Sequence, residues 1–133
     1  MNTNWNNEKL KAFVKNTLGC GCPEKVFEKI DFSKLPTVVD EEDATRIVVG
    51  DTLLIYVICP IPTANFVDSV ESIGLAGKAD RNANNYNRFR LVVSGIEDDV
   101  QQEKVSKSFS KSFNTDEKMH IHFVDKELVD GLN

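Results

Sequence analysis

The residues best suited to chemistry in this sequence are two cysteines separated by one glycine, in the segment Cys20-Gly21-Cys22-Pro23. The glycine lets the backbone adopt a positive φ angle, so both sulfur atoms can turn toward one point. Proline is favoured at the first position of a helix, which places Cys22 at the N-cap of a predicted helix. The free amides and the positive end of the helix dipole stabilise a thiolate there. Glu24 opposes this effect, because a nearby carboxylate disfavours a second negative charge.

A thiolate is both a nucleophile and a metal ligand, so three kinds of chemistry are open to this segment. The pair could form a redox-active disulfide, although a single intervening residue strains the ring and makes the disulfide easier to reduce. In that interpretation Cys22 is the thiol that ionises more readily and Cys20 is its resolving partner. The pair could also bind a metal, or one cysteine could act as a nucleophile. The structural alternative is a tight turn between two helices with inert, buried cysteines.

A metal site needs further ligands, and the sequence offers a third cysteine and two histidines. Cys59 ends an apolar predicted strand, and His120 and His122 are two residues apart on another, so they share a face. Together, Cys20, Cys22, Cys59 and His120 would complete a tetrahedral zinc set. The chain contains three cysteines, so an iron–sulfur cluster on four thiolates would require a partner chain. Alternatively, Cys59 packs in the core and the histidines lie on the solvent side of an edge strand.

A second group with binding chemistry is basic and contains Lys78, Arg81, Arg88 and Arg90. The last two residues alternate on one strand and therefore share a face, as an anion-binding or nucleic-acid patch would require. The formal net charge of the chain is -5, which gives no general attraction to nucleic acid or anionic lipid. No familiar RNA-binding motif is recognisable. We therefore favour a solvated strand face here and expect no nucleic-acid partner.

The composition is that of an ordinary globular domain. The chain has 133 residues, of which 41% are hydrophobic and 28% are charged, so residues 1–133 are expected to form one domain. The longest apolar stretch, residues 53–61, is too short to cross a membrane as a helix. The first eleven residues are polar, and three cysteines do not make a disulfide framework. We therefore expect a cytoplasmic protein without a membrane span.

Two helices are predicted in the first part of the chain. Together they would form an N-terminal helical pair. Apolar residues at helical spacing predict the first helix over residues 7–18. The second begins at Pro23 and has Ile30 on its buried face. Residues 32–43 contain a proline and an acidic run, so we expect a connection there with a short edge strand at residues 37–39.

Two further helices are predicted in the second half of the chain. Thr63 is suited to cap the third, which Gly74 or Gly77 would close. The fourth follows the acidic residues 97–99, whose charge is favourable at a helix N-terminus. Its buried side is predicted to contain Val105, Phe109 and Phe113.

The strand pattern indicates a mixed sheet. Strands are predicted at residues 45–49 and 52–59, joined by Gly50-Asp51 in a two-residue hairpin turn. The second of these is apolar nearly throughout, as is typical of a central strand. Strands at residues 88–94 and 119–124 are each reached through a helix, which implies crossover connections. We therefore expect an α+β fold, with helices packed on a mixed sheet of four or five strands around a central hairpin.

Two functional hypotheses follow. In the first, a small intracellular protein uses Cys20 and Cys22 as a redox dithiol or as ligands of zinc or an iron–sulfur cluster. In the second, the chain is an interaction module without catalysis that binds a protein partner or its own copy, with Trp5 as an anchor. No Gly-rich phosphate loop, H-E-x-x-H or G-x-S-x-G motif is present. The sequence leaves both an enzyme and a binding protein open.

Overall fold

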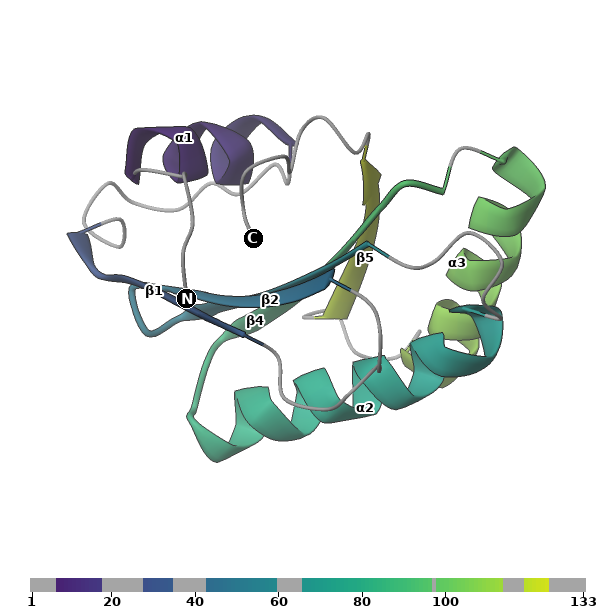
Figure 1. Ribbon diagram of the computed structural model, residues 1–133. Helices are drawn as coiled ribbons and strands as arrows, with labels where there is room; N and C mark the ends of the chain where they lie inside the picture. The colour runs from purple at the N-terminus through teal and green to yellow at the C-terminus, as the bar shows by residue number, and fades with distance from the viewer. Residues whose placement is uncertain are drawn as a thin grey trace.

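The computed structural model describes residues 7–17, 28–34, 43–59, 66–96, 98–113 and 119–124. The strands are β1 (Ile30–Lys34), β2 (Asp43–Val49), β3 (Leu53–Cys59), β4 (Arg88–Ser94) and β5 (Met119–Val124). The helices are α1 (Asn7–Ala12), its π-helical continuation η1 (Phe13–Thr17), α2 (Phe66–Ala83) and α3 (Asp99–Phe113). Figure 1 shows α1 on one face of the sheet and α2 with α3 on the other. The described residues therefore form three layers.

The sheet has five strands in the order β1-β2-β3-β4-β5. The first three strands are antiparallel, whereas β3 with β4 and β4 with β5 are parallel. Each parallel pair is connected through a helix, α2 for the first and α3 for the second. The expected α+β class, the mixed sheet and the crossover connections are thus confirmed.

The central hairpin forms where its turn residues indicate. Gly50 and Asp51 have φ angles of 59° and 55°, which is the pattern of a type I′ turn. The amide of Thr52 donates a hydrogen bond to the carbonyl of Val49 at 3.1 Å and closes the turn. The pairing of Val49 with Leu53 leaves three residues, Gly50, Asp51 and Thr52, between the strands, so the loop is one residue longer than the expected two-residue turn. One register step would exchange the two faces of both strands, so this turn also decides which residues face each layer.

Each face of the sheet has its own apolar core. Alternate residues of β3 and β4 face α2 and α3, and the others face α1 and η1. The core under α2 and α3 includes Leu54, Tyr56, Ile58, Phe89, Leu91, Val93, Val105, Phe109 and Phe113. The core under α1 includes Leu10, Phe13, Val14, Ile47, Val49, Leu53, Ile55, Val57 and Val92. The buried face predicted for the helix that is now α3 is confirmed.

The first part of the chain departs from the expected pattern. Ile30, predicted on a helix, begins β1, and it pairs with Val49 while Phe32 pairs with Ile47. Both side chains pack against the core under α1, and Asp31 between them is exposed. Partly buried and exposed side chains thus alternate along this segment, which is the pattern of a strand and not of a helix. The predicted start of the second helix and the edge strand at residues 37–39 lie outside the described residues, and the first helix is confirmed over 7–17.

The end of α2 also departs from expectation, because Gly74 and Gly77 lie within the helix and do not close it. A Cβ atom at Gly77 would lie 2.5 Å from Phe89, and one at Gly74 would clash with Phe113. Both glycines are therefore explained by close packing of aromatic rings against the helix backbone. The helix continues for six residues beyond Gly77, to Ala83. This extension carries Asp80 to the sheet.

Among the described helices, none combines the length and the apolar character that a membrane-crossing helix requires.

Candidate functional site

The cysteine segment lies outside the part of the chain that the structure describes, and so does Trp5. Cys59 is the last residue of β3, and His120 is the second residue of β5. His120 pairs with Arg90, which pairs with Ile55, so Cys59 lies four residues further along the sheet than His120. That offset corresponds to about 13 Å along the strands and about 10 Å across two strand spacings. The register therefore does not bring these two predicted ligands together.

The described residues contain no group of three or more His, Cys, Asp or Glu side chains that could hold a metal ion. They give no support to a zinc site or an iron–sulfur cluster. Because Cys20 and Cys22 are outside the described ranges, the thiol and metal hypotheses for this pair stay predictions.

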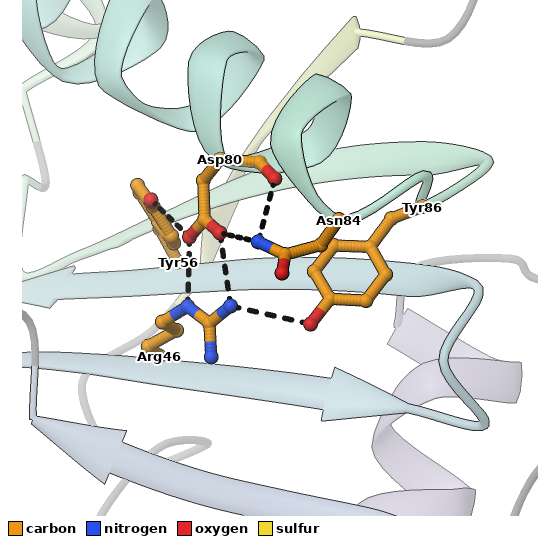
Figure 2. A network of polar contacts seen from close by, with 5 residues as sticks. All are labelled: Arg46, Tyr56, Asp80, Asn84 and Tyr86. Atoms are coloured by element: carbon orange, nitrogen blue, oxygen red, sulfur yellow. Dashed lines mark hydrogen bonds and ion pairs between the residues drawn. The ribbon is translucent and has the colours of Figure 1, made fainter.

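Among the described residues, the most extensive polar network joins the sheet to the last turns of α2 and is drawn in Figure 2. Arg46 on β2 meets Asp80 on α2 through two contacts, Nε to Oδ2 at 2.7 Å and Nη2 to Oδ1 at 2.9 Å. The hydroxyl of Tyr56 on β3 donates to Oδ2 at 2.7 Å, and the side-chain amide of Asn84 donates to Oδ1 at 2.9 Å. Tyr86 accepts a bond from Arg46 Nη2 at 3.3 Å.

This network is suited to hold α2 in place and not to move protons. The carboxylate of Asp80 accepts four hydrogen bonds, which is about its full capacity. Burial alone would raise the pKa of Asp80, but the hydrogen bonds from Arg46 and Tyr56 outweigh it and hold the pKa below its usual value. Burial and the bond to Asp80 raise the pKa of Tyr56, so its hydroxyl stays protonated. Neither group has a free site from which general acid–base catalysis could start.

An open cavity of about 310 Å³ lies beside this network, at the end of α2. Its lining is mainly polar and consists of Arg81, Asn82, Asn85, Tyr86 and Asn87. Its asparagines are exposed. Ligand pockets are usually lined mainly by apolar groups with a few polar ones among them. This lining is more typical of a hydrated loop surface than of a ligand pocket.

A second polar cluster lies on the opposite face of the sheet, on β4 and β5. Arg90 is 9% exposed, and its Nη1 donates to Nε2 of His122 at 3.2 Å. Arg88 lies two residues before Arg90 on the same face and is exposed. His120, which pairs with Arg90 across the strands, is also exposed. Arginine and histidine side chains from two neighbouring strands thus gather on the α1 side of the sheet.

The charge of Arg90 is not balanced by any described carboxylate. Its Nε atom is buried and has no hydrogen-bond partner, and the ion pairs between described residues do not include Arg88 or Arg90. Burial lowers the pKa of Arg90, and the charge of Arg88 lowers it further. A buried charge is normally paired, because desolvation makes an unpaired one expensive. This arrangement is therefore the least explained polar feature of the described structure.

His122 responds to the same environment. Burial, the charge of Arg90 and His120 together lower the pKa of His122 to about 4. Because a guanidinium can only donate, Nε2 of His122 must accept, and the ring is neutral with its proton on Nδ1. The sequence interpretation of a solvated strand face holds for Arg88 and His120. It is wrong for Arg90, and His122 is only partly exposed.

Comparison of the chain with protein-family models, with curated proteins and with solved structures gives no match. The function is therefore inferred from the geometry of the described residues.

Proposed function

We propose that this protein is a binding module that recognises a negatively charged group on the α1 side of its sheet, with Arg90 as the central cation. The observation that carries the proposal is the guanidinium of Arg90, which is 9% exposed and has an Nε without a partner. Functional sites are places where a fold retains a group that is costly in the free protein. An anion would neutralise this charge and satisfy its free donors.

Arg46, which is partly buried on β2 of the same sheet, differs from Arg90 in how its charge is compensated. Arg46 is held by Asp80 in a two-point ion pair, and Tyr86 accepts a further bond. The hydrogen bond to Asp80 is the main reason that the pKa of Arg46 is raised, whereas the pKa of Arg90 is lowered. Arg46 therefore contributes to the stability of the free protein. Arg90 has a neutral acceptor in place of a carboxylate, which is the arrangement expected if its counter-ion is a ligand.

The first experiment compares Arg90→Met with Arg46→Met in the full chain by urea denaturation. Replacing an unpaired buried cation by an apolar side chain of similar size is expected to leave the free energy of unfolding unchanged or to raise it by up to about 2 kcal/mol. Removing Arg46 leaves Asp80 without its cation and is expected to cost about 3 kcal/mol. A loss at Arg90→Met as large as at Arg46→Met would show that the protein itself neutralises Arg90, and would contradict the proposal.

The second experiment measures binding directly, as the melting temperature in a panel of small anions at constant ionic strength. A ligand that binds only the folded state raises the melting temperature. At least one of phosphate, sulfate, acetate and citrate is expected to stabilise the wild type and to have no such effect on Arg90→Met. If the two proteins respond alike to all four, the proposed site does not bind anions.

The hypothesis of a redox or metal-binding dithiol at Cys20 and Cys22 is a separate proposal. It rests on the sequence of that segment alone, and it neither requires nor excludes an anion site on β4. A protein partner could equally supply the negative group that Arg90 recognises. The anion site is preferred here because contacts and burial of described residues support it.

A further inference from the structure

We propose that the group recognised at Arg90 is a doubly charged phosphate on a small molecule, held by Arg90 and Arg88 together. This inference rests on the proposed anion-binding function and names the chemical class of its ligand. It follows from which donors of Arg90 are already used, from the position of Arg88, and from the charge of the whole chain.

The donors of Arg90 divide into a used side and an unused side. Nη1 is occupied by His122 at 3.2 Å, and Nε has no partner. In a planar guanidinium, Nε and the second terminal nitrogen point their hydrogens in the same direction and form the fork that binds two oxygen atoms at once. The contact with His122 therefore leaves an oxyanion fork free. Because Nε is covered in the free protein, the side chain of Arg90 has to move before an anion can reach this fork.

The position of Arg88 distinguishes among oxyanions. It lies two residues from Arg90 on the same face of β4, which is about 7 Å along the strand. Arg88 is exposed, so its long side chain is able to bend toward the same point. A carboxylate has two oxygens and one charge, which the fork of Arg90 alone would satisfy. A phosphate monoester has three free oxygens and nearly two charges at neutral pH, and so matches two guanidinium groups.

The charge of the chain favours a small ligand over a polymer. The formal net charge is -5, so a long polyanion meets general repulsion away from the site. Nucleic-acid binding usually relies on many phosphate contacts over an extended basic surface. Here the two cations, Arg88 and Arg90, lie on a single strand, β4. The phosphate groups of a nucleic-acid backbone are also diesters with one charge each, which makes poorer use of the second arginine.

The test is an NMR titration of the full-length, ¹⁵N-labelled protein at pH 7.5, followed at the arginine Nε–H signals and the amides of β4 and β5. The probes are inorganic phosphate, glycerol 3-phosphate, acetate and a short oligothymidylate. Both phosphates are expected to bind at least tenfold more tightly than acetate. Arg88→Gln should weaken phosphate binding about fivefold to tenfold and change acetate binding little. Arg90→Gln should abolish both.

Two control variants keep the result interpretable. Lys104→Gln removes one positive charge from an exposed position on α3, on the other side of the sheet, and should leave phosphate affinity within twofold of the wild type. Arg90→Lys keeps the charge but loses the fork, and should weaken phosphate binding about fivefold or more. Well-dispersed amide signals establish that each variant is folded. If Arg90→Lys binds as well as the wild type, a two-point contact is not used.

The failures of the two proposals give different results. Equal binding of acetate and phosphate, both lost in Arg90→Gln, would leave the anion site intact and overturn the assignment to phosphate. Tighter binding of oligothymidylate than of glycerol 3-phosphate would replace the small ligand by a nucleic acid. If no probe shifts the Arg90 signal, both the ligand class and the anion-binding function are wrong.

Discussion

Arg90 donates a hydrogen bond from Nη1 to Nε2 of His122 at 3.2 Å, so a permanent cation lies against a histidine that must remain neutral. Burial is the largest cause that lowers the pKa of His122 to about 4, and the charge of Arg90 is the next. In the unfolded chain the same histidine takes up a proton near pH 6.5. Between pH 6.5 and 4 the unfolded state therefore binds more protons than the folded state.

The first prediction is a loss of stability in this pH window. Since the unfolded state binds the extra proton, the free energy of unfolding falls as the pH is lowered from about 6.5 to 4, and this contribution is fully retained above that range. For a partly exposed histidine the loss between pH 7 and pH 5 should be about 1 kcal/mol. His122→Gln keeps an acceptor but cannot titrate, and urea denaturation should show a smaller loss for this variant than for the wild type.

His120→Gln is the matched control, because it lies on the same strand and keeps the contact between Arg90 and His122. It should lose stability on acidification much as the wild type does. An identical pH dependence for wild type and His122→Gln would mean that His122 does not stay neutral in the folded protein.

The second prediction concerns the carboxylate that joins α2 to the sheet. Asp80→Asn removes the charge that Arg46 pairs with, and it places an amide nitrogen where four donors converge. The free energy of unfolding should fall by about 2–3 kcal/mol. Asp51→Asn breaks an exposed ion pair with Lys29, whose side chains are 56% and 63% exposed, and should cost less than about 0.5 kcal/mol. Similar losses in the two variants would show that the network does not stabilise the fold.

The third prediction reverses the usual preference of helices for alanine over glycine. Gly77→Ala would gain about 1 kcal/mol in an open helix, but here its Cβ would meet the ring of Phe89 at 2.5 Å. The variant should therefore be less stable by about 1–3 kcal/mol. Ser72→Ala, at an exposed position of the same helix, should be neutral or slightly stabilising. Rescue of Gly77→Ala by Phe89→Leu would identify the ring as the cause, whereas a stable Gly77→Ala would contradict the packing.

Local signals were sufficient for much of the fold. The hairpin follows from two residues that accept positive φ angles, and α3 follows from Asp98, whose carboxylate accepts a bond from the amide of Val100, and from apolar spacing. The full length of α2 was not predictable, because Gly74 and Gly77 resemble helix ends unless the rings of Phe113 and Phe89 are known to lie on them. Composition does not reveal which glycine is required by packing.

The partners of the polar side chains were even harder to predict from the sequence, because they lie far apart along the chain. Tyr56 places a hydroxyl in the otherwise apolar β3, which is a visible sign of a buried polar contact, whereas Arg46 lies in the polar half of β2 and gives no such sign. Their common partner, Asp80, is 24 and 34 residues away in sequence, and no local pattern indicates it. For Arg90, the alternation of residues along β4 predicts the face of the sheet on which the side chain lies, but it does not predict that the side chain is buried. That burial depends on β5 and on the layer that covers this face of the sheet.

The last prediction concerns Cys20 and Cys22, which the sequence alone singles out. If they form a metal site, anaerobically purified protein should contain about one zinc or iron per chain by elemental analysis, and Cys20→Ser and Cys22→Ser should lose it. If they form a redox pair, thiol titration with and without reductant should show one reversible disulfide, absent in both variants. Cys59→Ser separates the two outcomes further, since it should weaken a metal site that uses Cys59 and leave a disulfide between Cys20 and Cys22 unchanged. Three thiols that neither bind metal nor oxidise would make the segment a structural turn.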